Sequence, residues 1–203
     1  MNINTLNILA DAISEVGSWY WWNVKDDMVQ VQFCDIMLYD DSKQEKEAHT
    51  TDNLAIRFYG HSFAVFLDNL NDYYWHQKLR EDDYELYAVD TYEMAFDNAE
   101  EAGSLLNDYE KVTVIKDYNG LETINSAKHL LYARCGNVAF IVGGDEIAVL
   151  GKDRRYTEEE IETASMKWWD YWKEYWRLRG TKDAFQEDYA CEISIPVKEE
   201  QSS

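Results

Sequence analysis

The segment 157–179 constrains the fold most, because it predicts a long helix that is apolar and aromatic over more than half of its circumference. Thr157 and Glu160 have the spacing of a capping box, and Gly180 is placed to end the helix. A surface helix needs an apolar stripe only about 100° wide. The remaining aromatic surface must therefore be covered by another element of the chain or by a partner.

Two neighbouring apolar lines make up this aromatic surface. One line holds Ile161, Ala164, Trp168, Tyr171, Tyr175 and Leu178, and the other holds Trp169, Trp172 and Trp176. In a first interpretation, the helix lies between a sheet and the first helix of the chain, and both lines belong to the core. In a second interpretation, the line of Trp169, Trp172 and Trp176 is an exposed ridge that contacts a protein partner or stacks on sugars.

The rest of the chain alternates between helical and strand periodicity, without internal repeats or low-complexity linkers. Helices are predicted at 4–16, 75–83, 99–109 and 123–133, and a polar loop at 40–53. Strands are predicted at 19–24, 28–38, 54–58, 63–67, 84–96, 112–115, 138–142, 147–150 and 191–197. These elements predict a single α+β domain over residues 1–198, with a largely antiparallel sheet packed against four to five helices, and a disordered tail at 199–203.

Turn residues and strand parity predict how some of these strands connect. Gly60 and His61 predict a hairpin between 54–58 and 63–67, and a second hairpin is expected between 138–142 and 147–150. Phe33 and Ile36 have opposite parity in the strand 28–38, which predicts a bulge near Cys34 and Asp35.

Charge is distributed unevenly along the chain. The net charge is −21, and residues 61–110 carry thirteen carboxylates against two cationic side chains. A surface this negative repels nucleic-acid backbones and anionic membranes, and it favours a basic protein partner. On the predicted strand and helix, the carboxylates could also form a rigid array that mimics nucleic acid. The candidate partner-binding acids are Glu81, Asp82, Asp83, Glu85, Asp90, Glu93, Glu100, Glu101 and Asp108.

This composition favours a non-enzymatic interaction protein that binds and neutralises a basic partner. Toxin immunity proteins and phage-encoded inhibitors of defence systems share this character at the level of composition. The widely spaced Cys34, Cys135 and Cys191 indicate reduced thiols and a cytoplasmic location. Residues 1–18 do not resemble a signal peptide, and no apolar run approaches the length of a membrane span. The sequence predicts no cofactor and no catalytic residue.

The run 140–150 offers an alternative. Its Gly143-Gly144-Asp145-Glu146 core resembles the signature hairpin of diguanylate cyclases and related palm-type nucleotidyl transferases, with Ile147 where that family has phenylalanine. The resemblance implies that Asp145 and Glu146 hold divalent metal ions for a nucleotide-processing reaction. The other interpretation is a plain tight turn in which the glycines supply positive φ angles. A third functional class, an aromatic carbohydrate-binding module, rests on the tryptophan ridge.

Overall fold

The computed structural model describes residues 1–14, 18–41, 51–69, 84–90, 93–135, 137–151 and 154–181. The predicted helix at 75–83, the predicted strand at 191–197, the tail at 199–203 and most of the loop at 40–53 lie outside the described residues. So do three of the candidate acids, Glu81, Asp82 and Asp83.

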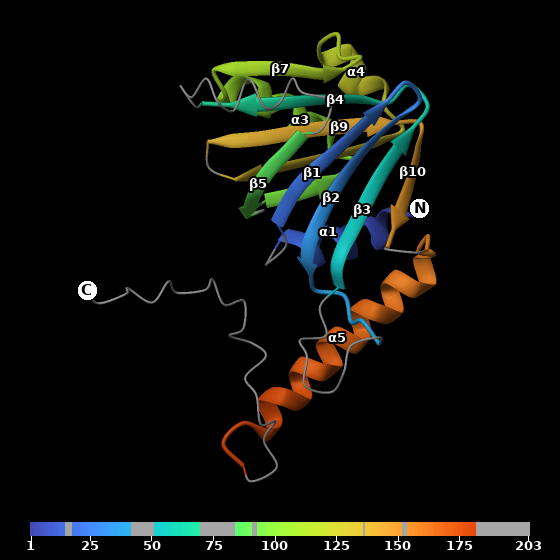
Figure 1. Cartoon of the computed structure of the whole chain (residues 1–203), viewed down its shortest axis with the longest axis vertical. Helices are drawn as coiled ribbons and strands as arrows, with labels where there is room; N and C mark the ends of the chain where they lie inside the picture. The colour runs from blue at the N-terminus through green and yellow to red at the C-terminus, as the bar shows by residue number, and fades with distance from the viewer. Residues whose placement is uncertain are drawn as a thin grey trace, which may run out of the picture.

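Two five-stranded antiparallel sheets, described here as the first and second sheets, form the body of the described chain (Figure 1). The first sheet has the order β10-β3-β2-β1-β5, and the second has the order β6-β8-β9-β4-β7. The strands of the first sheet are β1 (Ser18–Lys25), β2 (Met28–Ile36), β3 (Thr51–Tyr59), β5 (Tyr84–Asp90) and β10 (Glu146–Leu150). Those of the second are β4 (Phe63–Asp68), β6 (Glu93–Phe96), β7 (Lys111–Lys116), β8 (His129–Cys135) and β9 (Val138–Gly144).

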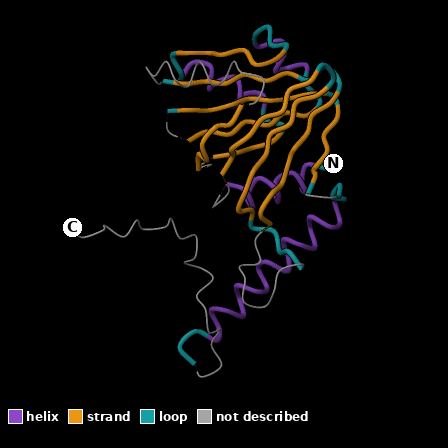
Figure 2. Tube along the Cα trace, viewed as in Figure 1, coloured by secondary structure: helices purple, strands orange, loops and turns teal. Residues whose placement is uncertain are grey.

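Four helices accompany the sheets in the described ranges. They are α1 (Ile3–Ser14), α3 (Ala99–Asp108), α4 (Leu121–Ser126) and α5 (Glu158–Leu178). The tube in Figure 2 shows that α5 runs away from the strand layers, whereas the other helices stay beside them. The α+β class, the antiparallel pairing and the long tryptophan-rich helix are therefore confirmed, but the strands form two sheets.

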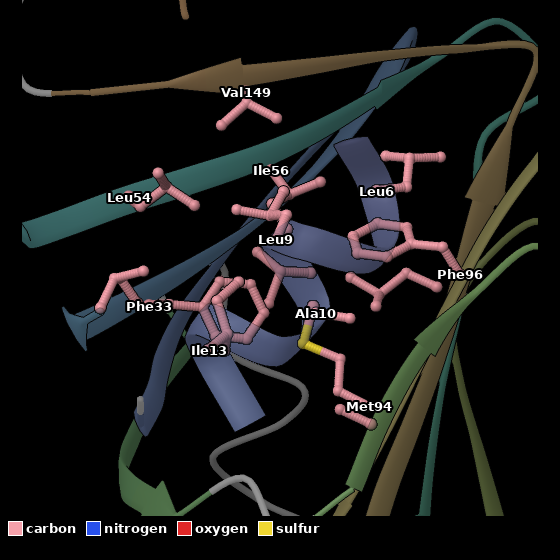
Figure 3. Packing of buried hydrophobic residues seen from close by; sticks show 14 of the residues in the cluster. Leu6, Leu9, Ala10, Ile13, Phe33, Leu54, Ile56, Met94, Phe96 and Val149 are labelled. Atoms are coloured by element: carbon pink, nitrogen blue, oxygen red, sulfur yellow. The ribbon is translucent and has the colours of Figure 1, made fainter. Parts of the chain in front are cut away.

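The main core lies between the two sheets. Phe33 and Ile56 of the first sheet and Phe140 of the second belong to one fully buried cluster, and α1 adds Leu9 and Ile13 to it (Figure 3). The aromatic rings of Phe33 and Phe140 lie 6.4 Å apart between centroids. Full burial of one such side chain contributes about 1.5–3 kcal/mol, so this cluster makes a large contribution to the stability of the body.

A second apolar cluster covers the opposite face of the second sheet. Ile141 and Tyr132 of that sheet pack with Ala102 and Leu105 of α3 and with Ile124 of α4. The centre of the second sheet is therefore covered on both faces, and every residue of β4 and β9 is buried. Strands covered on both faces read as continuous apolar runs rather than as alternating ones.

Both predicted hairpins are wrong, because the chain changes sheet where each turn was expected. β3 pairs with β2 and β10 in the first sheet, whereas β4 pairs with β7 and β9 in the second. β9 and β10 likewise belong to different sheets. The single strand predicted at 84–96 is also divided, into β5 of the first sheet and β6 of the second. The two sheets thus form a sandwich in which the chain passes directly from one sheet to the other at several corners.

Two further local predictions are wrong. The helix expected at 123–133 ends at Ser126, and β8 follows as an inner strand between β6 and β9. No bulge interrupts the pairing of β2 with β3, which runs in one register from Met28 to Ile36; the irregular pairing lies in β1, between Trp19 and Trp21. Phe33 and Ile36 are both buried. The chain just after β2 is bonded to both long helices, since Met37 N donates to Ala12 O and Tyr39 N to Ala164 O.

Candidate functional surfaces

The first candidate surface is an acidic face built on α3 and β6. The Asn98 side chain caps α3 by accepting a hydrogen bond from Glu101 N at 3.2 Å. Glu100 and Glu101 lie in the first turn, where carboxylates interact favourably with the positive end of the helix dipole. Ala102 and Leu105 are buried against the second sheet, so the acids on the outer side of α3 are held by a fixed scaffold.

One arginine lies among the carboxylates of this face. Glu93 and Arg134 are direct cross-strand partners on β6 and β8, and Arg134 Nε donates to Glu93 Oε2 at 2.5 Å. This hydrogen bond raises the pKa of the guanidinium, and Asp108 acts on the same group through its charge. Burial, and then a hydrogen bond to Glu101, raises the pKa of the Tyr132 hydroxyl. Arg134 and Tyr132 thereby bring Glu93, Glu101 and Asp108 to one place.

We define the acidic face by four side chains: Glu93, Glu100, Glu101 and Asp108. Glu100 and Asp108 are exposed, and Glu93 and Glu101 are half-buried. Of the remaining predicted acids, Glu85 and Asp90 do not join this face by strand pairing. They lie on β5 of the first sheet, where Glu85 pairs with Trp21 and Asp90 with Ser18. Glu85 and Asp90 therefore lie in a different sheet from Glu93.

The second candidate surface is the outer side of α5. Ile161, Trp168 and Tyr175 are buried, whereas Trp169 and Trp176 are 53% and 55% exposed. Trp172 is half-buried, with ring centroids 5.6 Å from Trp168 and 5.2 Å from Tyr175. The first apolar line of the sequence is thus largely core, and the second is an exposed ridge. Sequence reasoning missed Met166, which is 62% exposed and three residues before Trp169.

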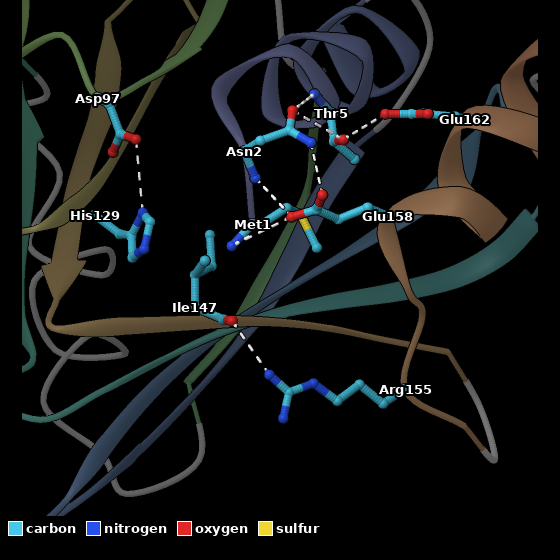
Figure 4. Close-up of polar contacts among 9 residues, drawn as sticks. All are labelled: Met1, Asn2, Thr5, Asp97, His129, Ile147, Arg155, Glu158 and Glu162. Carbon is cyan, nitrogen blue, oxygen red and sulfur yellow. Dashed lines mark hydrogen bonds and ion pairs between the residues drawn. The ribbon is translucent and has the colours of Figure 1, made fainter.

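The first turns of α5 are fixed to the start of the chain (Figure 4). Asn2 donates from its backbone N and its Nδ2 to the two carboxylate oxygens of Glu158, at 2.7 and 2.6 Å. The backbone hydrogen bond is the main reason that the pKa of Glu158 lies below its usual value. One turn later, Thr5 Oγ1 donates to Glu162 at 2.8 Å. The predicted capping box is confirmed, with Thr157 N donating to Glu160 Oε2 at 2.7 Å.

The Gly-Gly-Asp-Glu segment forms a corner between the two sheets. Asp145 N donates to the carbonyls of Tyr59 and Gly60, at 2.8 and 2.9 Å. Asp145 Oδ2 lies 2.6 Å from His61 Nδ1, and Oδ1 lies 3.2 Å from Lys128 Nζ. The hydrogen bond with His61, followed by that with Lys128, lowers the pKa of Asp145. The carboxylate thus joins the corner after β3 to the corner after β9.

The two glycines of this corner are needed for space. Neither Gly143 nor Gly144 has a positive φ, so the prediction that they supply such angles is wrong. A Cβ on Gly143 would lie 2.5 Å from the Phe63 ring, and one on Gly144 would lie 2.8 Å from the Tyr59 carbonyl oxygen. Glu146, the other proposed metal ligand, is exposed and opens β10. Within the described residues, no group of three or more His, Cys, Asp or Glu side chains is placed to hold a metal ion.

Comparisons with protein-family models, with curated proteins and with solved structures find no match. None of the helices in the described part of the chain combines the length and the hydropathy that crossing a bilayer requires.

Proposed function

We propose that the protein is a non-enzymatic interaction protein whose acidic face binds a basic surface on a protein partner and neutralises it. One observation carries the proposal. Arg134 is hydrogen-bonded to Glu93 and interacts with the charge of Asp108, and Glu101 interacts with Tyr132, two residues from Arg134 on the same strand. Several carboxylates facing a single guanidinium leave a local excess of negative charge, which attracts a cationic partner at long range.

The scaffold under the acidic face supports this role. Carboxylates on a mobile segment would lose conformational entropy on binding, whereas those on α3 are already fixed by the Asn98 cap and by Ala102 and Leu105. Exposed Glu100 and Asp108 are free of the arginine's direct hydrogen bond and are placed to meet a partner first. We place the protein in the cytoplasm, with reduced thiols, and assign it by analogy to the class of immunity proteins and anti-defence inhibitors.

A charge-reversal experiment tests this proposal. A fluorescent peptide rich in Lys and Arg is titrated with the wild-type protein and with the double variant Glu100→Lys/Asp108→Lys. We expect the variant to bind about tenfold more weakly and with a smaller dependence on salt, because rim charges mainly govern association and screening.

A matched variant separates the acidic face from total charge. Asp27→Lys/Glu146→Lys changes the net charge by the same amount, but these exposed residues lie at one end of the first sheet. This control should weaken binding less than about twofold under the same screening conditions. Equal losses in the two double variants would show that only total charge matters, and the proposal would fail. If only the acidic-face variant loses binding, pull-downs from the native host at low and high salt would identify the biological partner.

A further inference from the structure

The exposed side of α5 carries a regular seam beyond the three tryptophans. Its positions are separated by four, three, four and three residues, which is the spacing of the inward positions of a coiled coil. The seam consists of Glu162, Met166, Trp169, Lys173 and Trp176. Met166, Trp169 and Trp176 are the exposed large apolar side chains of α5, and Lys173 is exposed between the two indoles. This spacing of exposed apolar side chains matches the packing surface of a second helix.

We propose that this seam pairs with the same seam of a second copy of the chain, so that two α5 helices lie antiparallel about a two-fold axis near residue 171. In that register Trp169 faces Lys173 of the second copy, and Met166 faces Trp176 of the second copy. Each layer joins chemically complementary groups: a cation meets an aromatic ring in one, and a thioether meets an aromatic ring in the other.

Charge along α5 favours the antiparallel arrangement. The first turns carry Glu158, Glu159, Glu160 and Glu162, whereas the other end carries Lys173, Arg177 and the C-cap residue Arg179 against one carboxylate, Glu174. Antiparallel pairing places the acidic end of one helix beside the cationic end of the other and opposes the two helix dipoles. Parallel pairing would place acid beside acid. A basic protein partner suits this surface less well, because cations already lie along its second half.

The position of α5 leaves the seam accessible. Figures 1 and 2 show the helix running from the body away from both sheets. The anchored contacts of Asn2 with Glu158 and of Thr5 with Glu162 lie at its first turns and leave Trp169 and Trp176 exposed. From Glu162 to Trp176 the seam is about 21 Å long, at 1.5 Å per residue.

The area of the seam sets the expected strength. A fully buried aromatic side chain contributes about 150–250 Å², and about half of each of these indoles is still exposed, so four of them supply roughly 400 Å². With the rest of the seam, the interface falls at the small end of specific interfaces, below about 1,200 Å². We therefore expect a dimer that dissociates in the micromolar range.

Sedimentation velocity of the full chain, from low micromolar to several hundred micromolar, tests the association. Wild-type protein should pass from monomer to dimer, and Trp169→Glu should weaken dimerisation about thirtyfold or more. Val114→Glu changes a side chain of equal exposure on β7 and should leave the dimer intact. Circular dichroism checks that both variants keep their helix. A wild-type monomer at every concentration overturns the proposal, as does a dimer that survives Trp169→Glu.

Disulfide cross-linking tests the orientation. Met166→Cys and Trp176→Cys variants, mixed and oxidised, should form a linked dimer, whereas each variant alone should not. Each variant oxidised alone also shows whether the native Cys34, Cys135 and Cys191 form cross-links of their own. Cross-linking of each variant with itself would show a parallel pair and overturn the antiparallel register. If the protein is a monomer and acrylamide does not quench its tryptophan emission, another part of the same chain covers the ridge. That result would also overturn the proposal.

Discussion

The corner at Asp145 and the acidic face on α3 are both built from carboxylates and cations, but in opposite proportions. At the corner, one carboxylate is shared between two basic side chains, His61 and Lys128, and its backbone N–H is bonded as well. On the acidic face, Glu93 and Asp108 share the guanidinium of Arg134, and Glu101 adds a third carboxylate beside Tyr132. The first arrangement neutralises charge locally and the second leaves an excess.

This difference shows which acids are structural. Asp145 joins two crossings between the sheets, and its backbone N–H and both of its carboxylate oxygens already have partners inside the protein. Glu100 and Asp108 lie on the anchored helix α3, and their side chains are exposed. Exposed charges of this kind add little to the stability of the fold. Substitutions at the corner should therefore change folding, whereas substitutions on the acidic face should change binding.

The largest expected effect is steric and lies at the corner. Gly144→Ala places a Cβ 2.8 Å from the Tyr59 carbonyl oxygen and 3.2 Å from that of Gly60, both of them backbone atoms. Overpacking of this kind costs about 1–3 kcal/mol, and the rigid backbone on both sides favours the upper end. Urea unfolding, followed by tryptophan fluorescence, should show a lower midpoint.

Gly103→Ala on α3 is the matched control for that substitution. Its Cβ meets only the flexible end of Leu121, at 3.1 Å, and alanine is favoured over glycine in a helix by about 1 kcal/mol. This variant should unfold at an equal or higher urea concentration. If Gly144→Ala also left the urea midpoint unchanged, the close backbone approach at Gly144 would not constrain the stability of the fold. The expected difference between the corner and α3 would then be contradicted.

The sequence predicts local features of this fold better than its pairings. The capping box at Thr157, the helix after it and the positions of most strands follow from spacing and alternation within a few residues. The contact of Glu93 with Arg134 joins residues 41 positions apart, and no local pattern encodes it. One sequence pattern does indicate the two-sheet arrangement. The uninterrupted apolar run of β9 is typical of a strand covered on both faces.

A smaller and pH-dependent effect should distinguish Asp145 from an exposed acid. Because His61 and Lys128 lower its pKa in the folded state, its contribution to stability is present above its ordinary pKa of 3.8. That contribution is lost as the pH falls from this value through the lower folded-state pKa. Between pH 5 and pH 3, the wild-type protein should therefore lose more unfolding free energy than Asp145→Asn, as measured by urea titration at each pH.

The control for this pH dependence is Glu146→Gln, which removes the adjacent, exposed carboxylate. It should follow the wild-type curve over the same range. A parallel decline for wild type and Asp145→Asn would mean that the contacts with His61 and Lys128 contribute nothing to folding, and the corner would then resemble the acidic face.

The smallest expected effect is also the most discriminating, because stability and binding should change in opposite directions. Arg134→Gln removes the cation that is hydrogen-bonded to Glu93 and interacts with Asp108. The Arg134 side chain is 41% exposed, so solvent screens the pair and the loss of stability should not exceed about 1 kcal/mol. The same substitution leaves more uncompensated charge on the acidic face, and binding of the basic peptide should tighten roughly twofold to fivefold. Peptide anisotropy and urea unfolding of the same samples measure the two changes.

Arg177→Gln provides the comparison, since Arg177 pairs with Glu174 on α5 and its removal changes the net charge equally. If the acidic face is the binding surface, only the substitution at Arg134 should tighten binding, because the charge that it exposes lies where the peptide docks. Weaker binding by Arg134→Gln would mean that the guanidinium holds the carboxylates in the geometry that the partner needs. Its removal would then act on their arrangement rather than on their charge, and the excess of carboxylates over cations would no longer explain the difference between the face and the corner.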